Sequence, residues 1–335
     1  MTQPTDSYGG FWWRFYLGLG FNQALNFMKK YAITFPGQGS QSVGMMNAYA
    51  DNQLIKKTFH QASEIIGEDL WRLISEENEL IHQTIYTQPI MLTAGFVTWK
   101  ILVEAGFDQP CFVAGHSLGE ITALVAAEVI SFDVALLIVK KRAELMQAAV
   151  PEGIGGMAAI LGLADEDVIR ICKEAEGDGV IEPVNFNSPG QVVVAGHQSA
   201  IDKQLDVFKQ AGAKRAVKLP VSVPSHCSLM QTASDQFKTY LEDINFNTPN
   251  ISIIHNVDFQ SHSDPEAIKK SLSRQLSQPV QWTKTIEFMV NQGVEAFFEA
   301  GPNKVLLGLN RRIFKDGFHV SVNSVESINE IKENL

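Results

Sequence analysis

The chain has 335 residues, which at roughly 150 residues per domain predicts about two domains, or one domain with a large insertion. Its 45% apolar and 19% charged residues are ordinary for a globular protein and argue against disorder. The formal net charge of −10 disfavours nucleic acid or an anionic membrane as the main partner. Three cysteines without C-x-x-C spacing argue against a disulfide framework and a structural zinc site, and they predict a cytoplasmic protein.

Residues 1–27 differ from the rest of the chain. They contain an aromatic run, Phe11–Leu17, that is too short and too interrupted to span a bilayer, and they lack the features of a signal peptide. We interpret them as an extension of unassigned role, either an over-extended start before Met28 or an unstructured tail. An interfacial anchor is the alternative, but no lysine-rich face accompanies the aromatic residues. No apolar run approaches the ~20 residues of a membrane span.

From residue 28 onward, short β-rich runs alternate with helical patterns, which predicts an α/β fold with a mainly parallel sheet. The predicted strands are Tyr31–Phe35, Cys111–Ala114, Ile251–His255, Val294–Glu299 and His319–Asn323. The predicted helices include Gln88–Ala105, Leu118–Ile130, Ser131–Val150, Val280–Asn291 and Lys304–Phe314.

Residues 151–222 follow a different order, β-α-β-β-α-β, which is typical of a ferredoxin-like fold. The strands are Met157–Leu161, Val180–Asn185, Gln191–Ala195 and Lys214–Leu219, and the helices are Asp165–Glu174 and Ala200–Gln210. Pro183 weakens the second strand, since proline removes a ladder donor. We therefore predict a small subdomain over 151–222, inserted into a larger core formed by 28–150 and 223–335, with proline-rich hinges at its edges.

A nucleophile elbow is predicted where the strand Cys111–Ala114 meets the next helix. Gly115, Ser117 and Gly119 form G-x-S-x-G between an apolar strand and an apolar helix, the context that makes this motif meaningful and that predicts a hydrolase-like core. The helix N-terminus would favour a developing oxyanion, and the N–H of Leu118 is the natural first donor. The alternative is a glycine-rich turn with an incidental serine.

A serine nucleophile needs a base, and His226 is the strongest of eight histidines. It lies where the chain returns from the insertion, and clefts tend to form between subdomains. A structural histidine is the alternative there, as it is for His255 and His319 on predicted core strands. Cys227 beside it is expected to face the core. No acid lies at the end of a core strand between Ser117 and His226, so something neutral is expected to orient the histidine.

Arg142 falls on the apolar face of the helix Ser131–Val150, among Ala135, Ile138 and Met146. An arginine in such a place either snorkels to solvent or meets an anion. The guanidinium fork suits a carboxylate. Since this helix follows the elbow helix, Arg142 is a candidate for binding the acyl group, and both interpretations stay open.

Taken together, these residues resemble the malonyl-CoA:acyl carrier protein transacylases. The resemblance rests on motifs in the family's order and covers about residues 30 to 323. The matching segments are Phe35–Gln41, Gly115–Glu120, Asn185–Gln191, Val223–His226, Gln275–Leu276, Pro279–Trp282 and Gly301–Pro302.

The resemblance implies a seryl acyl-enzyme, with Ser117 as nucleophile and His226 as base. It implies that the carbonyl of Gln275 holds the histidine and that Gln38 supplies a second oxyanion N–H beside Leu118. Three residues are implied in substrate binding, namely Arg142 on the malonyl carboxylate, Gln88 in the pocket and His116 beside the serine. Gln278 and His255 stand where the family commonly has asparagine, which puts the support of the histidine in question.

The implied reaction moves a malonyl group from malonyl-CoA to acyl carrier protein by a ping-pong route, for fatty acid synthesis, in a monomer without cofactor or metal. The alternatives are a discrete acyltransferase of polyketide synthesis, a serine esterase or thioesterase, and a non-catalytic docking module. Because carrier proteins are generally acidic and this chain is acidic too, docking requires a local basic patch. Lys214 and Arg215 with Lys218 are one candidate, and Arg311 and Arg312 with Lys315 are the other.

Overall fold

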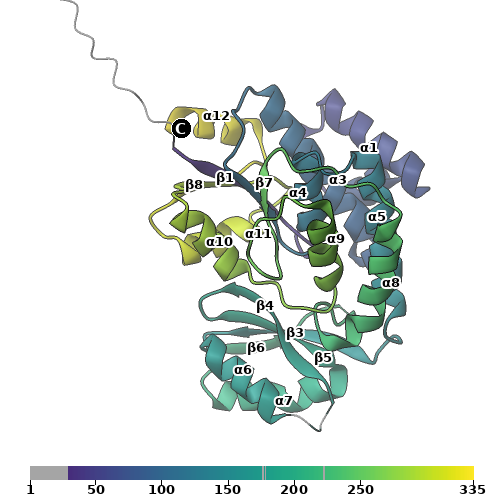
Figure 1. The fold of residues 1–335 in the computed structure, drawn as a ribbon, viewed down its shortest axis with the longest axis vertical. Coiled ribbons are helices and arrows are strands. Elements are labelled where there is room, and N and C mark those ends of the chain that lie inside the picture. The colour runs from purple at the N-terminus through teal and green to yellow at the C-terminus, as the bar shows by residue number, and fades with distance from the viewer. Residues whose placement is uncertain (1–28, 176, 178, 222) are drawn as a thin grey trace, which may run out of the picture.

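The computed structural model describes residues 29–335 except 176, 178 and 222, and within them the strands form two sheets (Figure 1). The aromatic run at 11–17, and with it the assignment of 1–27, lies outside the described residues. The larger sheet has the order β7-β2-β1-β8-β9, and all of its pairings are parallel. Its strands are β1 (Tyr31–Phe35), β2 (Phe112–Gly115), β7 (Ser252–Ile254), β8 (Ala296–Glu299) and β9 (Phe318–Ser321).

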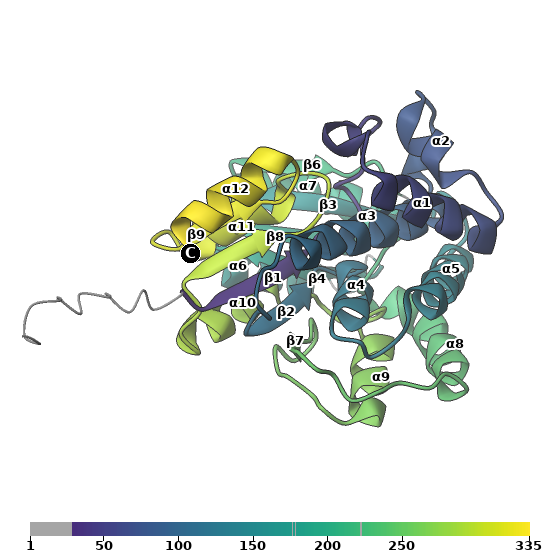
Figure 2. The same cartoon turned by 90° about the horizontal axis from the view of Figure 1, so that it is seen from above.

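Alternation along β1 sends side chains to two different cores, as the pleat of a strand requires. Ile33 and Phe35 enter the larger core, whereas Ala32 enters a second cluster with Trp282. Helices therefore cover both faces of the sheet and make three layers (Figure 2). The larger core is covered by α3 (Thr84–Glu104), α4 (Gly119–Ala126), α5 (Phe132–Ala148) and α12 (Val325–Asn334), and the second by α10 (Trp282–Asn291) and α11 (Val305–Ile313).

Further helices pack on the outside of this sandwich. They are α1 (Gln53–Ile66), α2 (Leu70–Ser75), α8 (Gln231–Glu242) and α9 (Pro265–Arg274), with short 3₁₀ turns η1 (Asn47–Tyr49), η2 (Leu80–His82) and η3 (Ser228–Met230). Among the described residues, no helix has the length and apolarity needed to cross a bilayer.

The second sheet is antiparallel and has the order β4-β5-β3-β6. Together with its two helices it gives the strand order of a ferredoxin-like fold. Pro183 lies on β4, at one edge of this sheet and next to a register shift, which is a kind of position where strands tolerate proline. The elements are β3 (Gly155–Leu161), α6 (Asp165–Glu174), β4 (Ile181–Ser188), β5 (Gln191–His197), α7 (Gln198–Gln210) and β6 (Arg215–Lys218).

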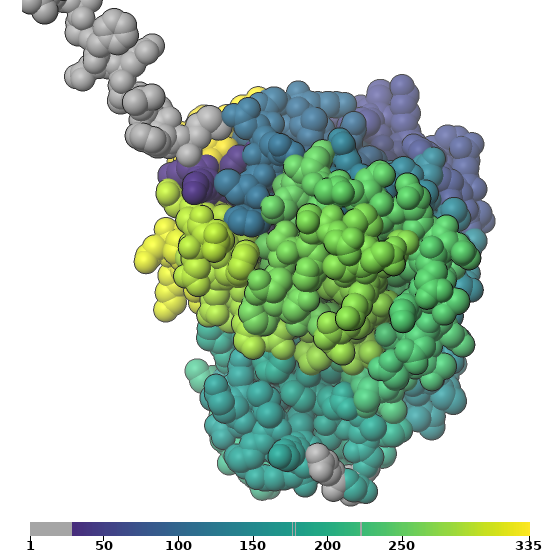
Figure 3. Space-filling model, viewed as in Figure 1, coloured from purple at the N-terminus to yellow at the C-terminus, as the bar shows by residue number. Residues whose placement is uncertain are grey.

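The predicted fold class is thus confirmed, with a parallel α/β core and a ferredoxin-like subdomain below it in Figure 1 and Figure 3. The subdomain limits at 151 and 222 stay a prediction. Strand β4 joins the two parts, because Phe186 N donates to Val280 O at 3.0 Å and Val280 N donates to Val184 O at 2.9 Å. These bonds explain why α10 begins at Trp282 and not at Val280 as predicted. The helix predicted over Leu118–Ile130 ends at Ala126, and Glu128 beyond it has a left-handed φ of 59°.

Candidate active site

The elbow after β2 is a tight turn that only glycine permits at two positions. Ser117 has a φ of 53°, which is strained for a residue with a side chain. A Cβ on Gly115 would lie 1.8 Å from the carbonyl carbon of Gly119, and a Cβ on Gly119 would lie 2.0 Å from Phe35 O. The close packing of these backbones lifts the Ser117 hydroxyl out of the sheet, as the G-x-S-x-G pattern predicted.

His226 meets this hydroxyl. Its Nε2 lies 2.7 Å from Ser117 Oγ, and its Nδ1 lies 2.6 Å from the main-chain oxygen of Gln275. The carbonyl oxygen accepts a hydrogen bond from Nδ1, so Nε2 is left to accept the hydroxyl proton. The neutral partner expected from the missing acid is therefore a backbone carbonyl. Cys227 beside it is buried in the core as expected.

The environment keeps His226 uncharged. Burial, assisted by the nearby Arg142 cation, lowers the pKa of His226 to about 3. A general base must be unprotonated before it can accept a proton, so the ring is in the competent form over the whole physiological range.

Arg142 reaches the same hydroxyl from α5. Its side chain is 1% exposed, so the snorkelling alternative is wrong. Its Nη2 donates to Ser117 Oγ at 3.1 Å and to Gln275 Oε1 at 2.9 Å, and its Nη1 donates to Gln88 Oε1 at 2.9 Å. Burial lowers the pKa of Arg142 to about 10, which still leaves it charged at neutral pH, and Nε has no partner among the described residues.

The other predicted residues surround this pair. Gln88 is buried and donates to Thr84 Oγ1 at 2.9 Å, which in turn donates to Gln38 Oε1 at 3.0 Å. His116 turns away from the serine, with Nε2 2.8 Å from Asn187 Oδ1 of β4. It thus ties the elbow to the subdomain. Lys214, just before β6, and Arg215, its first residue, are both exposed and make none of the contacts described above.

Two N–H groups remain available near the hydroxyl. Within residues 29–335 as described, neither Leu118 N nor Gln38 N donates to a protein acceptor. A Cβ on Gly37 would lie 2.5 Å from His116 O, so the loop after β1 packs directly on the elbow. Both N–H groups therefore lie on backbone that adjoins Ser117, which fits the predicted oxyanion donors.

Two residues of the site were missed by the sequence analysis. Asn256 accepts from Ser117 N at 2.7 Å and donates to Gly115 O at 2.6 Å, which clamps both sides of the elbow. Glu120 is fully buried and accepts from Gln275 Nε2 at 2.7 Å. The only sequence signal for Glu120 was its position as an acidic residue in a mostly apolar helix. Asn256 gave no signal, because it lies 139 residues from Ser117 in the sequence.

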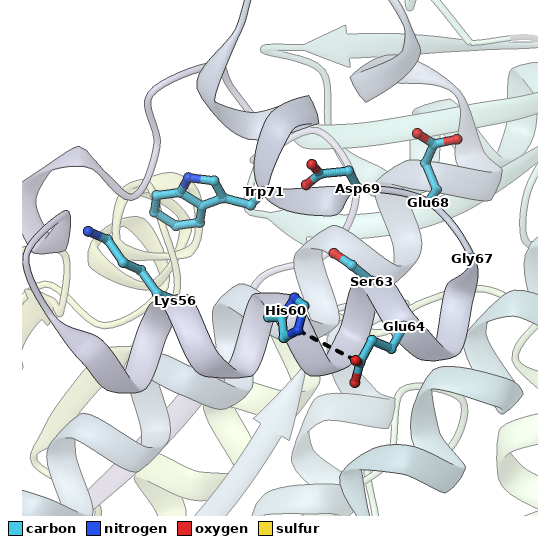
Figure 4. A pocket seen from close by; sticks show the side chains of 8 residues that line it. All are labelled: Lys56, His60, Ser63, Glu64, Gly67, Glu68, Asp69 and Trp71. Atoms are coloured by element: carbon cyan, nitrogen blue, oxygen red, sulfur yellow. Dashed lines mark ion pairs between the residues drawn. The ribbon is translucent and has the colours of Figure 1, made fainter.

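A hollow elsewhere carries no comparable chemistry. It has a volume of about 580 Å³ and lies between α1 and α2 (Figure 4). Its three acidic groups already have partners, because Glu64 contacts His60 at 3.4 Å, Glu68 contacts Arg72 at 3.5 Å, and Asp69 accepts from Arg72 N at 3.0 Å.

Comparison with known proteins defines the class. The model of the acyl transferase domain matches residues 33–334, and the chain belongs to this family. It is 49% identical over 288 residues to malonyl CoA-acyl carrier protein transacylase of Salmonella typhimurium, covering 85% of this chain and 93% of that protein. It is 48% identical over 312 residues to the Haemophilus influenzae protein of the same name, covering 92% of this chain and 100% of that one.

Solved structures agree with this class. An acyl-carrier-protein S-malonyltransferase from Burkholderia pseudomallei is 48% identical with a TM-score of 0.88, covering 90% of this chain and 99% of that chain. A malonyl-transacylase in complex with its type II PKS acyl-carrier protein is 45% identical with a TM-score of 0.89, covering 91% of this chain and 100% of that chain. The resemblance to malonyl-CoA:acyl carrier protein transacylases is confirmed.

We predict that Arg142→Ala raises the pKa of His226, because water entering the pocket and the loss of the cation both favour the charged ring. The acid limb of activity then moves to higher pH, since a protonated imidazole accepts no proton. The measurement is kcat/KM for acetyl-CoA against pH in both proteins. If the acid limb of kcat/KM stays at the same pH or moves to lower pH in the variant, Arg142 does not lower the pKa of His226.

Proposed function

We propose that the protein transfers the malonyl group of malonyl-CoA to the phosphopantetheine thiol of acyl carrier protein through an acyl-enzyme on Ser117, supplying extender units for fatty acid synthesis. The observation that carries the proposal is the buried Arg142 guanidinium 3.1 Å from Ser117 Oγ. A cation at that distance suits an acyl group that ends in a carboxylate. The names of the relatives point to the same substrates.

In the first half-reaction, Ser117 Oγ attacks the thioester carbonyl carbon while His226 Nε2 takes the hydroxyl proton. The carbonyl oxygen becomes an oxyanion that accepts hydrogen bonds from Leu118 N–H and Gln38 N–H. The carbon–sulfur bond then breaks, and the coenzyme A sulfur leaves with the proton from His226. The malonyl carboxylate stays on Arg142.

The second half-reaction runs the same steps in reverse with a new thiol. The phosphopantetheine thiol gives its proton to His226 and attacks the ester carbonyl. The ester bond breaks, and Ser117 recovers the proton from His226. Since a thioester replaces a thioester, the transfer needs no oxidant, reductant or metal.

Hydrolysis and polyketide synthesis are the alternatives. A serine esterase of this fold orients its histidine with an acid, whereas His226 is held by a neutral carbonyl, which favours transfer. The polyketide alternative has the same chemistry, and it is supported by the likeness to the malonyl-transacylase in complex with a type II PKS carrier protein.

Transfer and hydrolysis are separated by one incubation. The protein is mixed with malonyl-CoA, with and without holo carrier protein, and malonate and malonyl carrier protein are quantified by mass spectrometry. We expect malonyl carrier protein to form at a rate far above that of malonate release. Malonate release that is fast and unaffected by carrier protein would instead identify a thioesterase.

Arg142→Ala tests the basis of malonyl selectivity. An acetyl group leaves the buried cation without an anionic partner, and breaking a buried ion pair costs about 3–5 kcal/mol, or roughly 10²–10⁴-fold. The variant is expected to lose malonyl transfer and to gain acetyl transfer relative to it. The measurement is a competition between malonyl-CoA and acetyl-CoA, and unchanged selectivity contradicts the proposal.

The basic residues proposed for docking converge in the fold. Lys214 N donates to Leu161 O at 2.8 Å, and the neighbouring Gly162 N donates to Gly190 O at 2.7 Å. Arg312 of α11 contacts Gln191, the residue after that turn. Lys214 and Arg215 thus lie on the same side of the subdomain as Arg312, which gives an acidic carrier protein one surface with positive charge from both parts of the chain.

Charge reversal tests this surface. We expect Lys214→Glu with Arg215→Glu to raise KM for carrier protein several-fold, because rim charges steer association, while coenzyme A release is nearly unchanged. The matched control reverses two adjacent exposed lysines on the distant α1, Lys56 and Lys57. Equal losses on both substrates, or an equal effect of the control, contradict docking at this surface.

We further propose that the protein acts as a monomer in the cytoplasm. All three cysteines lie in the described part of the chain and are free thiols, with Cys172 and Cys227 buried. Free thiols suit a reducing compartment.

A further inference from the structure

A buried carboxylate lies directly behind the nucleophile and takes no part in the steps above. Glu120 is the second residue of α4 and is fully buried. Its Oε2 accepts from Gln275 Nε2 at 2.7 Å and from Asn256 N at 3.2 Å, and its Oε1 accepts from His255 Nδ1 at 2.7 Å. A fully buried carboxylate with three donors is a costly feature that suggests a specific task.

The first consequence concerns the side-chain amide of Gln275. Its Nε2 donates to Glu120 and to Ser117 O at 2.9 Å, while its Oε1 accepts from Arg142 at 2.9 Å. A flipped amide would turn its NH₂ toward the guanidinium, donor against donor, and its oxygen toward two acceptors. Because an ionised carboxylate only accepts, Glu120 permits a single orientation of this amide.

The second consequence concerns charge. Arg142 is buried, and its direct partners are the neutral oxygens of Gln88, Ser117 and Gln275. A buried cation needs a compensating anion. Glu120 supplies one through the Gln275 amide without touching the guanidinium, so Arg142 stays charged and its Nε remains without a protein partner in the described chain.

We propose that Glu120 is the positioning residue for recognition of the acyl carboxylate, because it orients Arg142 through Gln275 and balances its charge from a distance. A carboxylate in direct contact with Arg142 would occupy the place that the substrate needs. This inference rests on the proposed function, since it concerns selectivity for a malonyl over an acetyl group.

His255 belongs to the same arrangement. It is fully buried at the end of β7, donates from Nδ1 to Glu120, and stacks on His262 with 5.1 Å between ring centres. Its Nε2 has no partner among the described residues, so the ring's only hydrogen bond within them is the one from Nδ1 to Glu120. His255 therefore holds the carboxylate of Glu120 in place as a hydrogen-bond donor.

The first experiment is Glu120→Gln, with kcat/KM measured for malonyl-CoA and for acetyl-CoA. A lost hydrogen bond to a charged group predicts a fall of about tenfold or more in the malonyl-to-acetyl ratio, mainly through KM for malonyl-CoA. A merely structural role would lower both values together and leave the ratio unchanged, which would overturn the inference. Glu299→Gln, at another buried carboxylate that caps α11, is the matched control and should keep the ratio.

A second pair of variants covers the case in which Glu120→Gln does not fold. His255→Asn keeps a donor close to the position of Nδ1, whereas His255→Leu removes it. We expect a ratio close to that of the wild type in the first variant and a lowered ratio in the second. Equal ratios in both would overturn the role of His255 as donor.

The malonyl preference of the wild-type protein distinguishes failure of the proposed function from failure of the role proposed for Glu120. If it does not prefer malonyl-CoA, the proposed function itself fails. If it prefers malonyl-CoA and Glu120→Gln retains the preference, the function stands and only the role of Glu120 is wrong.

Discussion

The 2.7 Å contact between Ser117 Oγ and His226 Nε2 joins two parts of the chain that are 109 residues apart. Every proton transfer in the proposed mechanism depends on this contact. Two local constraints produce it. The elbow holds the hydroxyl up because glycine backbones pack against each other beneath it. The segment 274–276, called here the 270s segment, holds His226. The backbone N–H of His226 donates to Leu276 O at 2.9 Å, and its ring Nδ1 donates to Gln275 O.

Gln275 connects this contact to Arg142, the residue that we propose binds the acyl carboxylate. Its backbone oxygen orients the base, while its side chain joins the elbow, Arg142 and Glu120. One residue thus couples the position of the base to that of the cation. The neighbouring cation helps to keep His226 neutral, so the group that suits the acyl carboxylate also preserves the proton acceptor.

The fold was largely predictable because its signals are local. The β-rich run Tyr31–Phe35, the glycine pattern around Ser117 and the β-α-β-β-α-β order each depend on neighbouring residues. Positions set by distant partners were harder. The start of α10 depends on Val280 pairing with β4, a strand about a hundred residues earlier, and no local pattern contains that information.

The same distinction between local signals and distant partners applies to the residues of the candidate site. Ser117 and the apolar setting of Arg142 were visible from the residues alone, and the family resemblance pointed to Gln275. The buried partners Glu120 and Asn256 were not visible, because their roles arise only when α4, β7 and the 270s segment meet. An acid in an apolar helix is a weak signal until its donors are known.

The most direct test of the central claim is the mass of the protein after brief exposure to malonyl-CoA without carrier protein. The account predicts a covalent malonyl adduct on the peptide that contains Ser117, absent in Ser117→Ala and discharged when holo carrier protein is added. Absence of the adduct under conditions of active transfer, or an adduct on another residue such as the exposed Cys111, would contradict it.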